Sequence, residues 1–218
     1  SKALTINPKN YQAKWNKSLS HLRLGQYEEG WPLYESRWHI LGMAEHAKHQ
    51  RIPLWLGENS LVGKTILIHA EQGFGDTIQM SRYLPILENK MGANVIFEVN
   101  CYLKDLMKTL SPSIQIIDAS NRLPQMVETE IDFQCPIMSL PLAFKTTVAS
   151  IPSKTPYLYA NNEKRIAWRK KLEENSLHTK PFRVGITWSG SGHYAGKKNI
   201  KRDLPFDIVY ALAEGLST

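Results

Sequence analysis

Residues 65–85 constrain the fold of this 218-residue chain more than any other segment. They begin with the apolar run TILIH (residues 65–69), continue through a turn with two glycines, and lead into the start of a helix. A buried strand that passes directly into a helix is typical of α/β proteins, in which ligands bind at the carboxyl ends of the strands. Glycines at such a turn let backbone N–H groups approach a substrate closely. The segment therefore predicts an α/β fold with a ligand site at this turn.

Strands and helices alternate through residues 61–160, which predicts a parallel sheet covered by helices. We expect strands at Thr65–Ala70, Asn94–Val99, Ile114–Asp118 and Asp132–Pro136. We expect helices at Asp76–Lys90, Leu103–Leu110 and Ser139–Phe144. An extended linker with prolines then leads into residues 161–218, which open a second α/β unit. Its expected elements are a charged helix at Asn162–Asn175, a strand at Phe182–Trp188 and a helix from about Pro205.

Residues 1–38 predict a pair of helices, Tyr11–Gly25 and Tyr27–Trp38, with apolar residues at helical spacing. This pair resembles a tetratricopeptide repeat, a helical hairpin of about 34 residues. A lone repeat cannot bury its own apolar face, so we expect it to dock on the next domain or on further repeats upstream. Residues 39–60 form the connector to the α/β domain.

The turn after the first strand carries acidic residues whose roles the spacing leaves open. Asp76 stands at the predicted helix start, where it could be the N-cap residue or accept a proton from a substrate hydroxyl. Glu71 could be a second functional acid or could form an ion pair with Arg82 or Lys64. His69 lies within the apolar strand, and we expect it to be buried and hydrogen-bonded.

A second glycine-rich loop, residues 189–196, follows the later predicted strand. Its backbone amides could hold a phosphate, with positive charge added by Lys197, Lys198, Lys201 and Arg202. A solvated loop explains the same residues equally well. The net charge of +7 favours anionic partners, and a solvated basic face accounts for it as readily. No nucleic-acid-binding motif accompanies the charge, so we expect no nucleic-acid partner.

We expect no metal site. His46 and His49 have a spacing of three residues, which is possible for metal ligands, but no third ligand follows nearby. The sequence also lacks an Asp-x-Asp element, by which many sugar transferases hold the donor diphosphate through a metal ion. In such an enzyme, cationic side chains and helix dipoles would have to neutralise the leaving group.

The composition favours a cytoplasmic protein without a membrane span. No run of about 18 apolar residues occurs, and the first residues do not form a basic-then-apolar leader. Cys101 and Cys135 stand outside any CxxC pattern, so we expect two reduced thiols in or near the core.

The segment HAEQGFGDTIQ (residues 69–79), followed by Arg82 and Tyr83, resembles a signature of tetratricopeptide-repeat proteins with a glycosyltransferase family nine domain. These proteins are relatives of the ADP-heptose heptosyltransferases. Further segments resemble family elements: residues 25–38 the final repeat, 55–57 the domain entry, 135–141 (CPIMSLP) and 184–190 (VGITWSG). The resemblance spans nearly the whole chain.

The resemblance implies a GT-B fold, in which one Rossmann-like domain holds the acceptor and a second holds a nucleotide sugar. It identifies Asp76 as the general base. The residues implied for acceptor binding are Glu71, Gln72, Gly73, Gly75, Thr77, Gln79 and Arg82. The residues implied for the donor phosphates are Thr187, Ser189, Gly190, Lys198 and Arg202. No cofactor is implied, because the nucleotide sugar is itself the donor substrate.

The implied function is that of a fragment of a metal-independent glycosyltransferase, which moves a sugar from a nucleotide-sugar donor to a hydroxyl of a glycan, lipid or protein acceptor. Asp203 departs from the family pattern by placing an acid beside the phosphate site. The family segment that closes the nucleotide-sugar pocket lies beyond Thr218, so we expect residues 1–218 to be inactive alone. The alternative is a non-catalytic interaction module, with repeats that bind a protein partner and a degenerate sugar- or nucleotide-binding domain.

Overall fold

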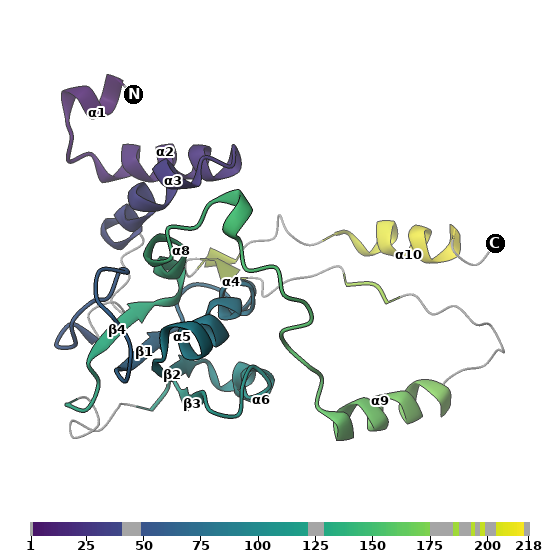
Figure 1. Ribbon diagram of the computed structural model, residues 1–218. Helices are drawn as coiled ribbons and strands as arrows, with labels where there is room; N and C mark the ends of the chain where they lie inside the picture. The colour runs from purple at the N-terminus through teal and green to yellow at the C-terminus, as the bar shows by residue number, and fades with distance from the viewer. Residues whose placement is uncertain are drawn as a thin grey trace. The chain divides into compact units, whose positions relative to one another are not determined.

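The structure is a computed structural model that describes residues 2–40, 49–121, 129–174, 185–187, 193–194, 197–198 and 204–215. The chain divides into two compact units, Ser1–Trp168 and Arg169–Thr218 (Figure 1). The first unit contains a helical hairpin and an α/β domain, and it carries the turn that the sequence singles out.

A four-stranded parallel sheet forms the centre of the α/β domain. Its strands are β1 (Thr65–His69), β2 (Asn94–Val99), β3 (Gln115–Asp118) and β4 (Phe133–Pro136), in the order β3-β2-β1-β4. The predicted α/β class and the four strands are confirmed, with bounds that differ by no more than one residue. The chain runs outward from β1 to β3 and then returns to the other side of β1. In sheets of this kind such a reversal opens a crevice at the carboxyl ends, here those of β1 and β4.

The helix expected at Asp76–Lys90 is divided into shorter pieces. It consists of α4 (Phe74–Met80), a 3₁₀ turn η3 (Ser81–Tyr83) and α5 (Leu84–Met91). Pro85 lacks the backbone N–H and crowds the preceding turn, which explains the tighter winding just before α5. The other expected helices also begin as 3₁₀ turns: η4 (Cys101–Leu103) precedes α6 (Lys104–Met107), and η5 (Ile137–Ser139) precedes α8 (Leu140–Ala143).

Successive residues of the strands face opposite sides of the sheet, and each side has its own core. On one side, Ile68 and Phe97 pack with helix residues that include Leu84, Met107 and Leu140. On the other side, a smaller cluster contains Ile52, Leu67, Ile96 and Ile131. Cys135 is buried as expected, whereas Cys101 is exposed, because it begins η4 beyond the end of β2.

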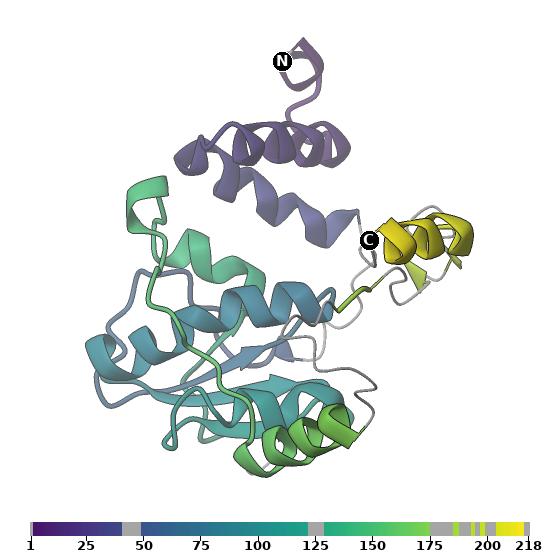
Figure 2. The same ribbon diagram turned by 90° about the vertical axis from the view of Figure 1, so that its right-hand side faces the viewer.

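The N-terminal helices form a hairpin, which Figure 2 shows above the α/β domain. Its elements are α1 (Lys2–Ile6), α2 (Tyr11–Arg23), α3 (Tyr27–Tyr34) and the 3₁₀ turn η1 (Glu35–His39). The Asn10 side chain caps α2, because its Oδ1 atom accepts a hydrogen bond from the Ala13 N–H at 2.9 Å. Gly25 makes the turn with a positive φ of 75°. The two predicted helices are therefore present, although the second changes from α-helix to 3₁₀-helix at Glu35.

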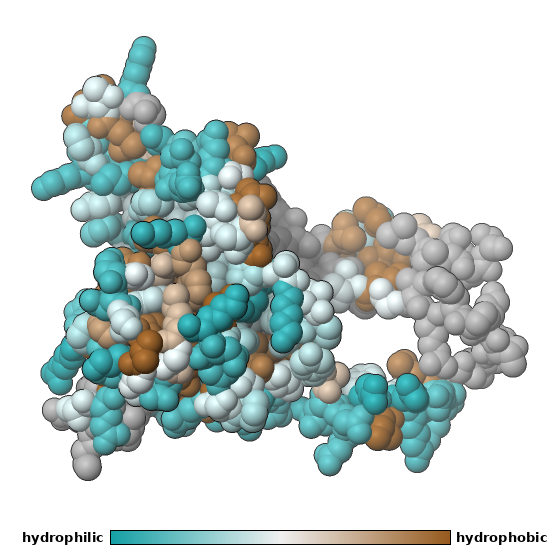
Figure 3. Space-filling view, in the orientation of Figure 1, coloured by the Kyte–Doolittle hydropathy of each residue, from teal (hydrophilic) through white to brown (hydrophobic). Residues whose placement is uncertain are grey.

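Residues 151–160 run without regular structure into α9 (Asn162–Glu174), and the boundary between the two units falls within this helix. The second unit contains α10 (Phe206–Gly215), which confirms the helix expected from Pro205. Apolar side chains gather on α10 (Figure 3), and Phe206 and Tyr210 are exposed. Within the described residues, no helix is both long enough and apolar enough to cross a membrane.

Two expectations for the second unit need correction. The expected strand Phe182–Trp188 is described only at residues 185–187, and these residues are not in a strand. Part of the expected loop at residues 189–196 instead forms β5 (His193–Tyr194), which pairs antiparallel with β6 (Lys197–Lys198). The basic stretch therefore begins within a short hairpin rather than after an open loop.

Candidate functional site

The candidate site is the turn that joins β1 to α4, at the point where the strand order reverses. Gln72 adopts a positive φ of 61°, which is unusual for a residue with a side chain. Gly73 is the N-cap of α4, and Gly75 has open space where a side chain would begin. The turn therefore exposes backbone at the carboxyl edge of the sheet, where ligands bind in related sheets.

Asp76 supports the start of α4 from within the helix. Its Oδ2 atom accepts a hydrogen bond from the Gly73 N–H at 3.0 Å. The N-cap residue is Gly73, so the prediction that Asp76 itself is the N-cap was wrong in position, although its carboxylate does cap the helix. Across the described residues, the Oδ1 atom makes no hydrogen bond and can receive a proton. Thr77 adds support, because its Oγ1 donates to the Gly73 carbonyl at 3.2 Å.

Glu71 has a partner that sequence spacing does not reveal. Its side chain is buried, and Arg37 donates to both carboxylate oxygens, at 2.8 and 3.0 Å. The Met138 N–H donates to the same carboxylate at 3.1 Å. The predicted ion pair with Arg82 or Lys64 is therefore wrong: Lys64 pairs with Asp132 instead, at 2.9 Å.

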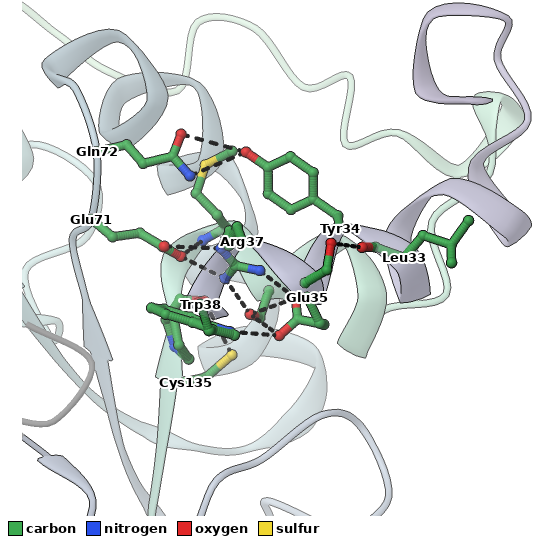
Figure 4. A network of polar contacts seen from close by, with 12 residues as sticks. Leu33, Tyr34, Glu35, Arg37, Trp38, Glu71, Gln72 and Cys135 are labelled. Carbon is green, nitrogen blue, oxygen red and sulfur yellow. Dashed lines mark hydrogen bonds and ion pairs between the residues drawn. The ribbon is translucent and has the colours of Figure 1, made fainter. Parts of the chain in front are cut away.

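Arg37 is the centre of a wider polar network (Figure 4). Its guanidinium also donates to Glu35 at 2.5 Å and to the Ser139 hydroxyl at 2.7 Å. The Ser139 hydroxyl in turn donates to Glu35. Burial raises the pKa of Glu71, and the hydrogen bonds and charge of Arg37 oppose that rise. The network joins η1 of the hairpin to the turn after β1 and to η5 after β4.

Gln72 is held from the hairpin as well. Its Nε2 group donates to the Tyr34 hydroxyl at 3.1 Å, and the two side chains face each other in Figure 4. Burial raises the pKa of the Tyr34 hydroxyl. The Arg37 guanidinium lies over the Tyr34 ring, with 5.0 Å between its central carbon and the ring centroid.

Gln79 and Arg82 lie apart from the turn. Arg82 donates to the Pro152 carbonyl at 3.0 Å and to the Tyr157 hydroxyl at 3.4 Å, and so ties the linker to η3. Both residues line a pocket of about 130 Å³ between the hairpin and the α/β domain. None of residues 71–77 lines this pocket, so the structure separates the expected acceptor-side residues into two groups.

Sequence reasoning missed an aromatic pair beside the turn. Phe74 is 47% exposed and Tyr102 is 82% exposed, with 6.3 Å between their ring centroids. Phe74 begins α4 after β1, and Tyr102 lies in η4 after β2. Because the carboxyl ends of adjacent parallel strands meet at one edge of a sheet, the positions of these residues could have indicated the pair.

His49 and His69 are both buried. His69 is buried with its Nε2 atom 2.9 Å from Gln134 Oε1, which confirms the prediction for it. His49 is also buried, and its Nε2 lies 3.3 Å from Glu98 Oε2. His46 lies outside the described residues, and those that are described contain no group of three or more possible metal ligands.

The expected phosphate-binding residues belong to the second unit and are described only in part. Thr187 is exposed, and Lys198 lies in β6. Ser189, Gly190 and Arg202 lie outside the described residues, as does Asp203.

Comparison with known proteins finds one distant relative. Protein FlbA of Caulobacter vibrioides is 25% identical over 181 residues, an alignment that covers 77% of this chain and 29% of FlbA. The chain therefore spans less than a third of the length of this relative. No protein-family model matches the chain, and no solved structure matches it.

Proposed function

We propose that this chain is part of a metal-independent glycosyltransferase of the family nine type, with a GT-B arrangement and a tetratricopeptide-like hairpin at its start. The observation that carries the proposal is the Asp76 carboxylate at the switch point of the sheet, with Oδ2 held by the Gly73 N–H and Oδ1 unengaged within the described part. The resemblance of residues 69–79 to the family signature supports the same reading.

In the proposed reaction Asp76 is the general base. Its carboxylate accepts the proton of an acceptor hydroxyl while that oxygen forms a bond to the anomeric carbon of the donor sugar. The bond between the anomeric carbon and the diphosphate breaks, and the nucleoside diphosphate leaves with the bonding electron pair. The Gly73 N–H keeps the carboxylate oriented because it holds one of the two oxygens.

The acceptor would lie along the carboxyl edge of the sheet. The exposed rings of Phe74 and Tyr102 offer aromatic faces beside the turn, and the rings are close enough to form one surface. Gly75 leaves space for an approaching hydroxyl. Glu71 would act through the turn rather than by contact, because its carboxylate is already engaged by Arg37 and Met138.

In this proposal, residues of the second unit would neutralise the negative charge of the donor's diphosphate. Thr187, Ser189, Gly190, Lys198 and Arg202 are the proposed contacts to the diphosphate, and their charge and backbone amides suit an anionic leaving group. The nucleotide sugar is a substrate, and the proposal includes no cofactor and no metal ion.

The test is Asp76→Asn in the full-length parent protein, assayed for sugar transfer from nucleotide-sugar donors. Loss of a general base lowers turnover by roughly 10²–10⁴-fold, with donor binding retained. Asp105→Asn is the control, because Asp105 is an exposed carboxylate that pairs only with Lys108 and Lys164 within the described residues. Unchanged turnover in Asp76→Asn would remove the base assignment.

The alternative function is a non-catalytic interaction module. It is favoured because two of the expected site residues are engaged by other residues of the chain. Glu71 binds Arg37, and Arg82 binds the Pro152 carbonyl in the linker. A wild-type full-length protein that binds nucleotide sugars yet transfers no sugar to any glycan, lipid or protein acceptor would support this alternative.

A further inference from the structure

We propose that Tyr34 and Arg37 of the helical hairpin are positioning residues for the turn that carries Asp76. The hairpin then contributes to the site by holding the turn in position. This inference rests on the proposed role of Asp76, and it names contacts that no sequence motif or relative assigns.

The first step is the anchoring of Glu71, directly after β1. Arg37 donates to both of its carboxylate oxygens and Met138 donates a backbone N–H to one of them. These three hydrogen bonds, from two partners, lie in a buried environment, where an ion pair with additional hydrogen bonds is held in one geometry. The backbone therefore enters the turn from a fixed point.

The second step is the conformation of Gln72. Its φ of 61° lies in the left-handed region, where a residue with a side chain persists only if its surroundings hold it. The hold comes from the hairpin: the Gln72 amide is hydrogen-bonded to the Tyr34 hydroxyl at 3.1 Å. The preceding residue, Glu71, is held by its hydrogen bonds with Arg37.

The third step connects Gln72 to Asp76. The peptide that joins Gln72 to Gly73 carries the N–H that Asp76 Oδ2 accepts at 3.0 Å. A change in the Gln72 backbone rotates this peptide and removes the donor. The chain of contacts thus runs from the Tyr34 hydroxyl through Gln72 and Gly73 to the Asp76 carboxylate.

A purely structural network would have a different effect. If these contacts only fastened the hairpin to the sheet, their loss would lower stability without changing the turn. Tyr34→Phe separates the two cases, because it removes the hydroxyl and keeps the ring that packs with Trp15 and Trp31. The Gln72 side chain is exposed, so its amide can turn to water and the variant remains folded.

The matched control is Tyr83→Phe. The Tyr83 hydroxyl is also buried and hydrogen-bonded, to the Thr146 hydroxyl at 2.9 Å, and within the described structure it makes no hydrogen bond to residues 71–76. The control therefore removes a similar hydrogen bond from the same compact unit and leaves the hydrogen bonds of the turn in place.

The experiment uses the full-length protein and two measurements. The first is amide hydrogen exchange at Gly73, which we expect to quicken about tenfold in Tyr34→Phe and to stay unchanged in Tyr83→Phe. The second is the kinetics of sugar transfer, in which we expect kcat to fall about tenfold with little change in KM, less than the roughly 100-fold loss that a 1 Å misplacement can cause.

Unchanged exchange at Gly73 in Tyr34→Phe would overturn the positioning role, whatever the kinetics. Faster exchange with unchanged kcat in an active enzyme would also overturn it, because the turn would then move without consequence for the reaction. A wild-type protein with no transferase activity would refute the proposed function instead, and it would leave the exchange result to decide whether the hairpin sets the turn.

Discussion

At the scale of single residues, Arg37 decides how the hairpin and the sheet are joined. It is fully buried between two carboxylates, and its guanidinium also lies over the Trp38 ring. Arginine suits this place because its planar fork can bind a carboxylate through two parallel hydrogen bonds. The Glu71 charge is tolerable in the interior only while this fork is present.

We therefore expect Arg37→Met to lower the free energy of unfolding by about 3–5 kcal/mol, because it leaves Glu71 buried without its partner. Urea unfolding followed by circular dichroism measures the change. The double variant Arg37→Met/Glu71→Met removes both charges, and it should be more stable than the single variant. A double variant as unstable as Arg37→Met would contradict the argument from unpaired charge.

At the scale of elements, the two hairpin helices pack closely where they cross. Gly30 of α3 faces Leu22 of α2, and a Cβ atom at Gly30 would lie only 2.6 Å from a Leu22 side-chain carbon and 3.2 Å from the Leu22 backbone nitrogen. The missing side chain at Gly30 thus sets how near the helices approach. Gly75 in α4 presents the opposite case, since its Cβ would meet nothing within 4 Å.

The two glycines predict opposite effects of the same substitution. Gly30→Ala should lower the free energy of unfolding by about 1–3 kcal/mol, because the added methyl overpacks the helix crossing. Gly75→Ala should leave it unchanged or raise it by up to about 1 kcal/mol, because alanine is the better helix former. Thermal melting of both variants compares them, and equal melting temperatures would show that the crossing can relax.

At the scale of the whole molecule, the described structure contains an α/β domain with a four-stranded parallel sheet and parts of a second unit. The chain covers 29% of the length of FlbA. In the proposed enzyme the donor would be held by the second unit, and its proposed phosphate contacts are spread through residues 187–202. Acceptor and donor sites would thus come from different parts of the parent protein.

The family resemblance implies that the segment closing the nucleotide-sugar pocket is not among residues 1–218. We therefore expect residues 1–218 alone to transfer no sugar, whereas the full-length protein does. The same separation should appear in thermal shift: a nucleotide-sugar donor raises the melting temperature of the full-length protein and leaves that of residues 1–218 unchanged, because a ligand stabilises only the fold that binds it. Sugar transfer by residues 1–218 would show that the donor site is already complete within them.

The sequence by itself determined the α/β class, the four strands and the place of the turn. These follow from local signals: apolar runs of strand length, glycines between a strand and a helix, and an acid in the first helical turn. Only the tertiary structure decided what the acidic and basic residues do. Glu71 pairs with Arg37, 34 residues away, and Arg82 binds the carbonyl of Pro152, 70 residues away. Such partners depend on how the hairpin and the linker pack against the sheet, and no local spacing encodes that packing.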